Sequence, residues 1–336
     1  MVETRIWHGG DLGEARALFP HAPAPWIDLS TGINPIAYPL PALPASAFAR
    51  LPEPADQAAL EAAAARAYGG VDPACVVAAP GTQVLISLLP FVVPARAVVR
   101  EVAIVTPTYG EHAQAWRAAG ARVRAVAASD EGGGADVVVV VNPNNPDGRT
   151  WPAATLRARA ADLAGRAGLL VVDEAFADLE PVESLAADLP GNAIVLRSFG
   201  KTYGLAGIRL GFALARGALA ERLRAALGPW SVSGPALAIG RAALSDAGWR
   251  TEARRARAVD AARLDALLAR HAPSGVRGTT LFRTIETDAA PALFRRLGEA
   301  GIWVRRFADD ERRLRFGLPG GDGAWERLDA VLGNGA

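Results

Sequence analysis

Lysine occurs once in this sequence, at Lys201, and every other residue among the 36 basic ones is arginine. A guanidinium stays protonated at any accessible pH, whereas an ε-amine can lose its proton when it is desolvated and then act as a nucleophile. An amine can also form a Schiff base with an aldehyde, and arginine does not. The lone lysine in "SFGKTYGLAGIRLGF" therefore indicates covalent chemistry at this amine, unless it is a chance survivor of an arginine-rich composition.

Other residues with useful chemistry follow apolar, strand-like segments of the chain. They are Gly81, Thr82 and Gln83 in "APGTQ", Tyr109 in "TPTYG", Asn145 in "NPNNPDG", Asp173 in "VVDEAF", and Ser198 and Arg209 on either side of Lys201. Asn145 and Asp173 are 28 residues apart, as are Asp173 and Lys201. Because ligands of an open parallel sheet bind at the carboxyl ends of its strands, separate strands would each deliver one of these groups to one pocket.

One kind of ligand matches this set of groups. A glycine turn before a helix, with the Thr82 hydroxyl, suits a phosphate, and Tyr109 offers a stacking face for a planar ring. The Asn145 amide can donate to an oxygen on that ring, and a buried Asp173 requires a partner such as a protonated ring nitrogen. Lys201 would form a Schiff base with an aldehyde. The sequence therefore predicts pyridoxal 5'-phosphate as the cofactor, whose ring acts as an electron sink.

Simpler interpretations compete with this hypothesis. The "APGTQ" turn is also typical of a plain helix N-cap, and the asparagine–proline pairs of "NPNNPDG" are typical of turns. The "GKT" tripeptide is similar to the end of a nucleotide-binding loop, but that motif needs a glycine five residues before Gly200, where Val195 stands. A flexible glycine-rich loop around Lys201 would leave the aspartate, the asparagine and the arginine unexplained.

The composition argues against several classes of protein. The chain has 336 residues and a net charge of +1, so its charge does not point to nucleic acid or an anionic membrane as a partner. Cys75 is the only cysteine, which excludes an internal disulfide and a thiolate metal cluster, and we expect no metal. We find no signal peptide and no apolar run of membrane-spanning length, so we expect a cytoplasmic protein.

The hydrophobic pattern predicts that an α/β fold with a mostly parallel sheet positions these residues. From about residue 56, helix-like segments alternate with strand-like segments, as in βαβ units. The strand candidates are "EVAIVTP", "DVVVVVNP", "GLLVVDEAF", "NAIVLRSF" and "IRLGFAL", and the helix candidates are "DQAALEAAAARAYGG" and segments near 110–119 and 153–167. The uninterrupted valines at 137–141 are typical of a central strand covered on both faces.

The pattern changes toward both ends of the chain. After about residue 235, helices rich in arginine and alanine precede the strand candidates "GTTLFRTIET", "GIWVRRF" and "LRFGLP". The first 50 residues contain a capped helix, "DLGEARALFP", and a proline-rich stretch that excludes a central strand or a long helix. We predict an N-terminal arm at 1–50 that joins the small domain, a large cofactor-binding domain at 51–235, and a small α+β domain at 236–336.

The motifs "SFGKTYGLAGIRLGF", "NPNNPDG" and "VVDEAF" together resemble those of the class I and II aminotransferase superfamily, fold type I of the pyridoxal phosphate enzymes. Their order and spacing are most similar to the histidinol-phosphate aminotransferase branch, and the resemblance covers nearly the whole chain. It implies a homodimer, and it implies that Lys201 carries the cofactor and is catalytic together with Asp173 and Tyr109. By the same resemblance Asp173 pairs with the ring nitrogen, Asn145 bonds to the phenolate oxygen, Tyr109 stacks on the ring, the phosphate is held by Gly81, Thr82, Gln83, Ser198 and Arg209, and Arg315 binds the substrate carboxylate.

Two N-terminal motifs, "HGGDLGEA" and "DLSTGINPIAYP", look like those of the threonine-phosphate decarboxylases of cobalamin biosynthesis. That subfamily implies decarboxylation of L-threonine O-3-phosphate to (R)-1-aminopropan-2-yl phosphate. The candidates to bind this small phosphorylated amino acid are His8, Asn34, Asn145, Arg305, Arg306 and Arg315. His8 is also typical of a capping or turn residue, and Asn34 of a turn. Arg305 and Arg306 are equally typical of a solvated strand edge.

Two alternative functions stay open from the sequence. A histidinol-phosphate-type aminotransferase would share the cofactor contacts and differ in how the substrate is oriented, and a non-catalytic scaffold would not need Lys201 and Asp173. One position departs from the family pattern, because Phe176 stands where many relatives have tyrosine. Its missing hydroxyl leaves Asn145 as the main donor to the phenolate oxygen, which predicts an altered pKa for the Schiff base.

Overall fold

The computed structural model of the protein describes residues 8–93, 100–128 and 133–333. These residues form two compact units. The smaller unit contains the described residues up to 37, residues 146–148 and those from 252 onward, and the larger unit contains residues 38–145 and 149–251. The domain boundaries expected at residues 50 and 235 stay a prediction, because a division into compact units does not test which segments fold independently.

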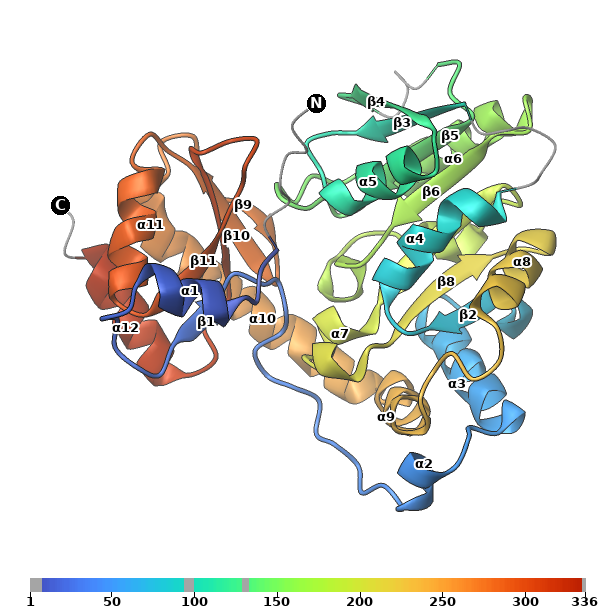
Figure 1. The fold of residues 1–336 in the computed structure, drawn as a ribbon, viewed down its shortest axis with the longest axis horizontal. Helices are drawn as coiled ribbons and strands as arrows, with labels where there is room; N and C mark the ends of the chain where they lie inside the picture. Colours follow the sequence, from blue (N-terminus) through green and yellow to red (C-terminus); the bar gives the residue numbers. More distant parts are fainter. Residues whose placement is uncertain (1–7, 94–99, 129–132, 334–336) are drawn as a thin grey trace. The chain divides into compact units, whose positions relative to one another are not determined.

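The larger unit is built on a seven-stranded sheet with the strand order β2-β8-β7-β6-β5-β3-β4 (Figure 1). In chain order the strands are β2 (Val76–Ala79), β3 (Glu101–Val105), β4 (Arg122–Val126), β5 (Val137–Val141), β6 (Leu169–Asp173), β7 (Ala193–Ser198) and β8 (Gly211–Ala215). Five neighbouring strands run parallel from β4 to β7, and β8 is antiparallel to both β7 and β2. Since β2 therefore runs in the same direction as the five, six carboxyl ends meet at one edge of a mostly parallel sheet.

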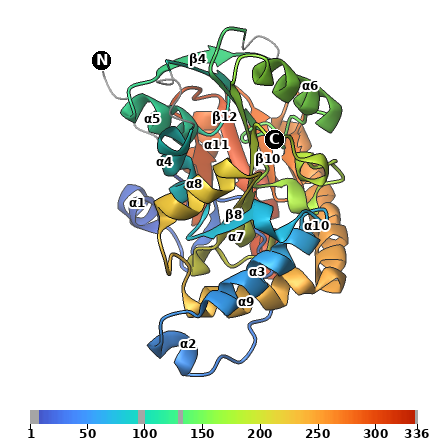
Figure 2. The same ribbon diagram turned by 90° about the vertical axis from the view of Figure 1, so that its right-hand side faces the viewer.

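Helices cover both faces of this sheet. The helices of the larger unit are α2 (Ser46–Ala49), α3 (Pro54–Ala67), α4 (Thr82–Val92), α5 (Gly110–Ala118), α6 (Ala153–Ala164), α7 (Phe199–Thr202), α8 (Ala218–Leu227) and α9 (Gly234–Ser245), with short 3-10 turns at Pro73–Cys75, Ala177–Leu179, Leu185–Asp188 and Ala206–Ile208. Val138 and Val140 pack in a core with side chains of α3, α6 and α9, whereas Val137 and Val139 pack in a core with side chains of α4, α5 and α8. Figure 2 shows α3 and α9 side by side. The valine run is thus a central strand buried on both faces, as predicted.

The sequence analysis listed five strands of this sheet as candidates; β2 was indicated only as the strand-like segment before Gly81, and β4 was missed. These two strands lie at the edges of the sheet. β2 has only four residues, and β4 carries two arginines in the segment "RVRAV", which weakens its apolar pattern. An edge strand is covered on fewer sides than a central one, so its sequence carries a weaker hydrophobic signal.

The smaller unit contains a five-stranded sheet with the order β1-β11-β12-β10-β9. Its strands are β1 (Ile27–Leu29), β9 (Arg277–Thr279), β10 (Phe282–Glu286), β11 (Ile302–Arg306) and β12 (Arg313–Gly317), and its helices are α1 (Leu12–Leu18), α11 (Ala290–Glu299) and α12 (Asp322–Gly333), with a 3-10 turn at Ala269–His271. The helix α10 (Ala247–Leu268) contains the junction at residues 251 and 252.

The proline-rich stretch forms neither a central strand nor a long helix, as predicted, but it does contribute the short strand β1. Ile27–Leu29 pair in parallel with β11 at the edge of the small sheet. The sequence pattern did not identify this strand. A three-residue strand at a sheet edge tolerates flanking prolines, because few of its N–H groups are needed for pairing.

Among the described residues no helix combines the length and the apolar character that crossing a membrane requires.

Candidate active site

The structure brings the predicted cofactor residues to one edge of the larger sheet. Along this edge, in strand order, lie Gly81, Thr82 and Gln83 after β2, Arg209 before the antiparallel β8, Ser198 and Lys201 at and after the end of β7, Asp173 at the end of β6, Asn145 after β5, and Tyr109 after β3. All of them belong to the larger unit. Side chains two apart in a strand share a face, so Asp173 points to the face where Val171 packs with side chains of α4, α5 and α8.

Asp173 is buried at this edge, with 3% of its surface exposed. Its Oδ1 accepts a hydrogen bond from the backbone N–H of Ala175 (3.0 Å), and its Oδ2 lies 2.9 Å from Nε2 of His112. An ionised carboxylate only accepts hydrogen bonds, so Nε2 of His112 carries the proton in this pair. The carboxylate is therefore fixed in direction at the end of β6.

His112 is a site residue that the sequence reasoning missed. It is fully buried in α5 and lies one turn beyond Tyr109, whose ring it meets edge to face at 6.3 Å. The available signal was its place in "TPTYGEH", three residues after a predicted site residue in a chain with four histidines. Residues three apart lie on the same side of a helix, so a helix starting near Tyr109 turns this histidine toward the same edge.

The Tyr109 ring is held at its hydroxyl end. Its hydroxyl donates to Oε1 of Gln83 at 3.0 Å, and Nε2 of Gln83 donates to Oε2 of Glu111 at 2.8 Å. Gln83 was predicted to hold phosphate, and its side-chain amide is instead engaged with these two residues. Its backbone N–H, in the first turn of α4, is therefore the group that can donate a hydrogen bond to an anion. The phosphate role of Gln83 stays a prediction.

Gly81 and Arg209 form the centre of a cradle at the start of α4. Gly81 has a φ of 92°, a conformation that favours glycine. A Cβ added at Gly81 would lie 2.7 Å from Nη2 of Arg209, so only glycine lets this guanidinium approach the backbone so closely. Arg209 itself has a φ of 54°, and its Nη1 donates to the carbonyl of Ala206 at 3.2 Å. Backbone N–H groups of a helix N-terminus and a guanidinium together suit a phosphate.

Lys201 projects from α7, a helix of four residues. Gly200 and Thr202 on either side are buried, whereas Lys201 keeps part of its surface accessible. Its Nζ lies 5.7 Å from the centre of the Phe176 ring. Phe176 thus presents an aromatic face, and no hydroxyl, to the amine. The expected effect of this residue on the pKa of the covalent link stays a prediction.

The three asparagines of the turn after β5 have different surroundings. Asn142 exchanges two hydrogen bonds with the backbone of Trp151, at 2.9 and 3.1 Å. Asn144 accepts from the Thr108 hydroxyl at 2.7 Å and donates to the carbonyl of Pro107 at 2.8 Å. These two asparagines therefore build the turn and tie it to the loop after β3. Asn145 is partly exposed at the same turn, and its bond to the cofactor stays a prediction.

These groups fit pyridoxal phosphate. The buried carboxylate of Asp173 suits a protonated ring nitrogen, and the close approach of Arg209 to Gly81 builds a cradle for a phosphate. Lys201 supplies the amine for an aldehyde, and Tyr109 supplies a flat ring whose position is fixed by Gln83. The described residues thus offer a partner for the ring nitrogen, the phosphate, the aldehyde and the face of the ring.

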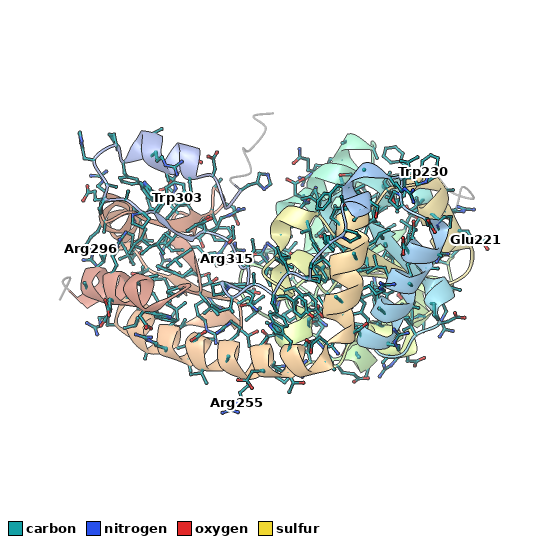
Figure 3. The ribbon with its side chains drawn as sticks, turned by 90° about the horizontal axis from the view of Figure 1, so that it is seen from below. Glu221, Trp230, Arg255, Arg296, Trp303 and Arg315 are labelled. Carbon is teal, nitrogen blue, oxygen red and sulfur yellow. The ribbon has the colours of Figure 1, made fainter. Side chains whose placement is uncertain are left out.

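In the smaller unit, the neighbouring substrate-binding candidates Arg305 and Arg306 face opposite sides of the sheet. Arg305 of β11 is directly opposite Arg315 of β12, so the two project from one face (Arg315 is labelled in Figure 3). Arg306 projects from the other face, where its Nη2 lies 3.5 Å from Oε1 of Glu14 and its guanidinium lies 4.2 Å from the centre of the Phe294 ring. Like charges placed directly opposite each other destabilise a sheet, and an anion bound between them relieves the repulsion.

The N-terminal motifs lie near Arg315. The Gly10 backbone N–H donates to Oγ of Ser30 at 2.7 Å, and Nη2 of Arg315 donates to the Ser30 carbonyl at 2.9 Å. Asn34 is buried, and its Oδ1 accepts from the N–H of Ile36 at 3.0 Å and from Nη1 of Arg257 at 3.1 Å. Asn34 therefore has a structural role in its turn. The substrate roles of Asn34 and of the exposed His8 stay predictions.

Comparisons with known proteins identify the family to which the chain belongs. Residues 26–324 match the family model described as aminotransferase class I and II. The chain is 43% identical over 330 residues to a threonine-phosphate decarboxylase of Pseudomonas aeruginosa, covering 97% of this chain and 96% of that one, and 46% identical over 326 residues to one of Sinorhizobium sp., covering 94% of each. A crystal structure of histidinol-phosphate aminotransferase from Sinorhizobium meliloti in complex with pyridoxal-5'-phosphate superposes with a TM-score of 0.81 at 23% identity, covering 100% of this chain and 98% of that one. The protein thus belongs to the class I and II aminotransferase family and has its fold.

Proposed function

We propose that this protein catalyses the pyridoxal phosphate-dependent decarboxylation of L-threonine O-3-phosphate to (R)-1-aminopropan-2-yl phosphate, a reaction of cobalamin biosynthesis. The observation that carries the proposal is the likeness, over nearly the whole chain, to two relatives named threonine-phosphate decarboxylase. The histidinol-phosphate aminotransferase of known structure is less similar in sequence and supports the fold alone. The residues at the sheet edge supply the chemistry that such a reaction needs.

Pyridoxal phosphate, when bound, supplies an aldehyde for the substrate amine and a ring that accepts the electron pair of the broken bond. Asp173, held by His112, binds the protonated ring nitrogen and keeps the ring electron-poor. Asn145 donates to the phenolate oxygen, and Tyr109 packs on the ring face. Gly81, Thr82, Gln83, Ser198 and Arg209 hold the phosphate, the first three through backbone N–H groups.

Two guanidinium groups suit the two anionic groups of the substrate. Arg315 binds the carboxylate in our proposal, and Arg305 binds the phosphate, because the strand register sets them on the same face of the small sheet. Arg306 is engaged with Glu14 and Phe294 on the other face, which makes it the weaker candidate. His8 and Asn34 lie in motifs that border this face through Ser30 and complete the proposed substrate set.

Lys201 is the residue that we propose to move the proton. Lys201 would hold the cofactor through its amine, and with the substrate bound the same amine would be available as the acid beside the reacting carbon. After carbon dioxide leaves, the protonated amine of Lys201 returns a proton to the same carbon. An arginine at this position would serve neither step, since its guanidinium does not lose its proton.

The alternative function is a histidinol-phosphate-type aminotransferase. It shares the fold and the proposed cofactor contacts, so only the reaction itself discriminates the two. The test incubates the purified protein with L-threonine O-3-phosphate alone and, separately, with histidinol phosphate and 2-oxoglutarate. We expect carbon dioxide and aminopropan-2-yl phosphate in equal amounts from the first mixture, without any oxo acid. Turnover of the second mixture only would overturn the decarboxylase proposal and favour the aminotransferase.

We also propose that the protein is a cytoplasmic homodimer. Large apolar side chains are exposed on the segment that includes α2, with Phe48 70% and Leu51 67% exposed. The carbonyl of Ala47 in α2 packs against Gly234 at the start of α9, and the loop before α9 exposes Trp230 (Figure 3). Clustered apolar side chains of this size support a binding surface, and a second copy of the chain is the partner that we propose. The single cysteine supports a fold that does not depend on disulfides.

A further inference from the structure

A cluster of buried charges lies on the other face of the large sheet, directly behind the cofactor residues. Arg197 has its Nη1 3.1 Å from Oδ1 of Asp178 and 3.4 Å from Oε2 of Glu174, and all three side chains are buried. Arg197 also lies over the ring of Tyr68, 4.8 Å from its centre. Strand neighbours point to opposite faces. Glu174 and Arg197 therefore face away from the site, whereas their neighbours Asp173 and Ser198 face it.

The cluster reaches Lys201 through one hydroxyl. Oγ1 of Thr202 donates to Oδ2 of Asp178 at 3.0 Å, and both residues are buried. Thr202 is the residue after Lys201 and the last of α7. A helix of four residues has little stability of its own, so its orientation depends on contacts of this kind.

The same cluster fixes the loop that carries Phe176. Glu174 and Asp178 bracket this loop, and both are ion-paired to one guanidinium. Glu174 is held further by the Ser184 hydroxyl at 2.5 Å and by the backbone N–H of Leu185 at 2.9 Å. Arg197 thereby fixes both ends of the loop that carries Phe176, and the ring of Phe176 faces the Lys201 amine.

Stability alone is a poor explanation for such a cluster. Removing charges from water is costly, and buried ion pairs are often replaced by apolar residues without loss of stability. The cluster connects the strand ends that carry Asp173 and Ser198 with the helix that carries Lys201. It can therefore hold these three residues in fixed relative positions. We propose that Arg197 and Asp178 are positioning residues for Lys201, and that the Thr202 hydroxyl is the link through which they orient its amine.

The most direct test removes only that link. Thr202→Val keeps the shape of the side chain and deletes the hydroxyl, and Thr202→Ser keeps the hydroxyl. The first measurement is the rate at which the apoprotein captures pyridoxal phosphate covalently, followed by its visible absorbance. The second is the dissociation constant of pyridoxine 5'-phosphate, which has no aldehyde and so reports the binding site without the amine.

We expect Thr202→Val to slow covalent capture by about tenfold, as for the loss of one buried hydrogen bond, and to change pyridoxine phosphate binding by less than about twofold. Thr202→Ser should restore the capture rate to within about twofold of the natural protein. An unchanged capture rate, or equal losses in both measurements, would overturn the proposal, since a general loosening of the site affects both.

Arg197→Met tests the centre of the cluster and should slow capture at least as much as Thr202→Val. Arg159→Met is its matched control, because Arg159 is also a buried arginine of the larger unit but pairs with Asp162 in α6, away from the sheet edge. A slower capture in Arg159→Met equal to that in Arg197→Met would contradict a positioning role. The inference rests on the cofactor site of the proposed function and not on its substrate, so these measurements keep their meaning if the reaction proves to be transamination.

Discussion

Among single residues, the proposed chemistry depends on differences between side chains that are often treated as equivalent. Lysine and arginine share a charge, but only the amine can join an aldehyde and then move a proton. Arg305 and Arg306 are neighbours in one strand, yet the pleat directs one toward Arg315 and the other toward Glu14. The sequence alone left these two arginines equivalent, and the strand register separates them.

The two arginines therefore make a matched pair for mutation. Arg305→Gln should raise the KM for L-threonine O-3-phosphate by about 10- to 100-fold, because a charge-assisted contact to the substrate phosphate is lost. Arg306→Gln, which loses a partly exposed ion pair, should change KM by less than about twofold. Steady-state kinetics of both variants measures this difference in KM. An equal rise in KM for both, or a rise for Arg306→Gln only, would contradict the proposed phosphate subsite.

Among the helices and strands, the site is assembled where strands end. The cradle between β2 and α4 illustrates this, because Gly81 combines a positive φ with a close approach to Arg209. The first requirement is one of backbone conformation, and the second is one of space. A glycine elsewhere in the larger unit separates the two requirements: Gly70 has a φ of 72° and open space where a Cβ would be.

Gly81→Ala and Gly70→Ala can be compared on this basis. Both should lower the free energy of unfolding by about 1 to 3 kcal/mol, since both place alanine at a positive φ. Only Gly81→Ala should weaken pyridoxal phosphate binding, by more than about tenfold, because the new Cβ displaces the Arg209 guanidinium. Thermal unfolding and cofactor titration measure the two effects. Equal cofactor affinity in the two variants would argue against a phosphate cradle at Gly81.

A buried carboxyl just after β6 makes stability depend on pH. Burial raises the pKa of the Glu174 carboxyl above its ordinary value of 4.5, and Arg197 offsets only part of this effect. The raised pKa belongs to the native state, and the ordinary value belongs to the unfolded chain. Between these two pKa values the native state binds the proton more tightly than the unfolded chain, so stability falls as the pH rises. The stability of the natural protein relative to Glu174→Gln should therefore fall as the pH rises above 4.5, by at most about 1.4 kcal/mol per pH unit.

Denaturant unfolding of both proteins between about pH 4 and pH 8 measures this difference. The glutamine cannot titrate, so subtracting the two stabilities removes the contribution of the other carboxylates. A relative stability that rises with pH would mean that the Arg197 charge dominates over burial. A constant difference would mean that Glu174 does not titrate in this range.

The elements also show what sequence reasoning can and cannot reach. The central strands are predictable because burial on both faces gives them continuous apolar runs, as at 137–141. Edge strands such as β1 and β4 were missed because they carry a weaker pattern. His112 and the side-chain role of Gln83 were missed for another reason: they depend on hydrogen bonds between segments far apart in the chain, here to Asp173 and Tyr109.

Taken as a whole, the chain provides two compact units and an exposed apolar segment. The cofactor residues all belong to the larger unit, and the arginines proposed for the substrate belong to the smaller one. The segment around α2 carries the exposed apolar side chains of Phe48 and Leu51. The family resemblance implies a homodimer, and this segment supports it as a contact surface.

Phe48→Glu should convert the proposed dimer to a monomer, because a carboxylate in the centre of an apolar interface is desolvated without a partner. Val259→Glu is the control, since Val259 is also exposed, at 66%, but lies on α10 and outside this segment. Sedimentation equilibrium gives the mass of each variant. A monomeric natural protein, or a Phe48→Glu variant that remains dimeric, would refute the proposed surface.

The proposed chemistry depends above all on the one lysine of this protein holding pyridoxal phosphate, and chemical trapping examines that link itself. Reduction of the loaded protein with borohydride converts a covalent link at the amine into a stable pyridoxyl group, and peptide mass spectrometry locates that group. We expect the label on the peptide that contains Lys201, and a folded but colourless and inactive Lys201→Arg variant. An unlabelled Lys201 peptide, or visible cofactor absorbance retained by Lys201→Arg, would contradict the proposal.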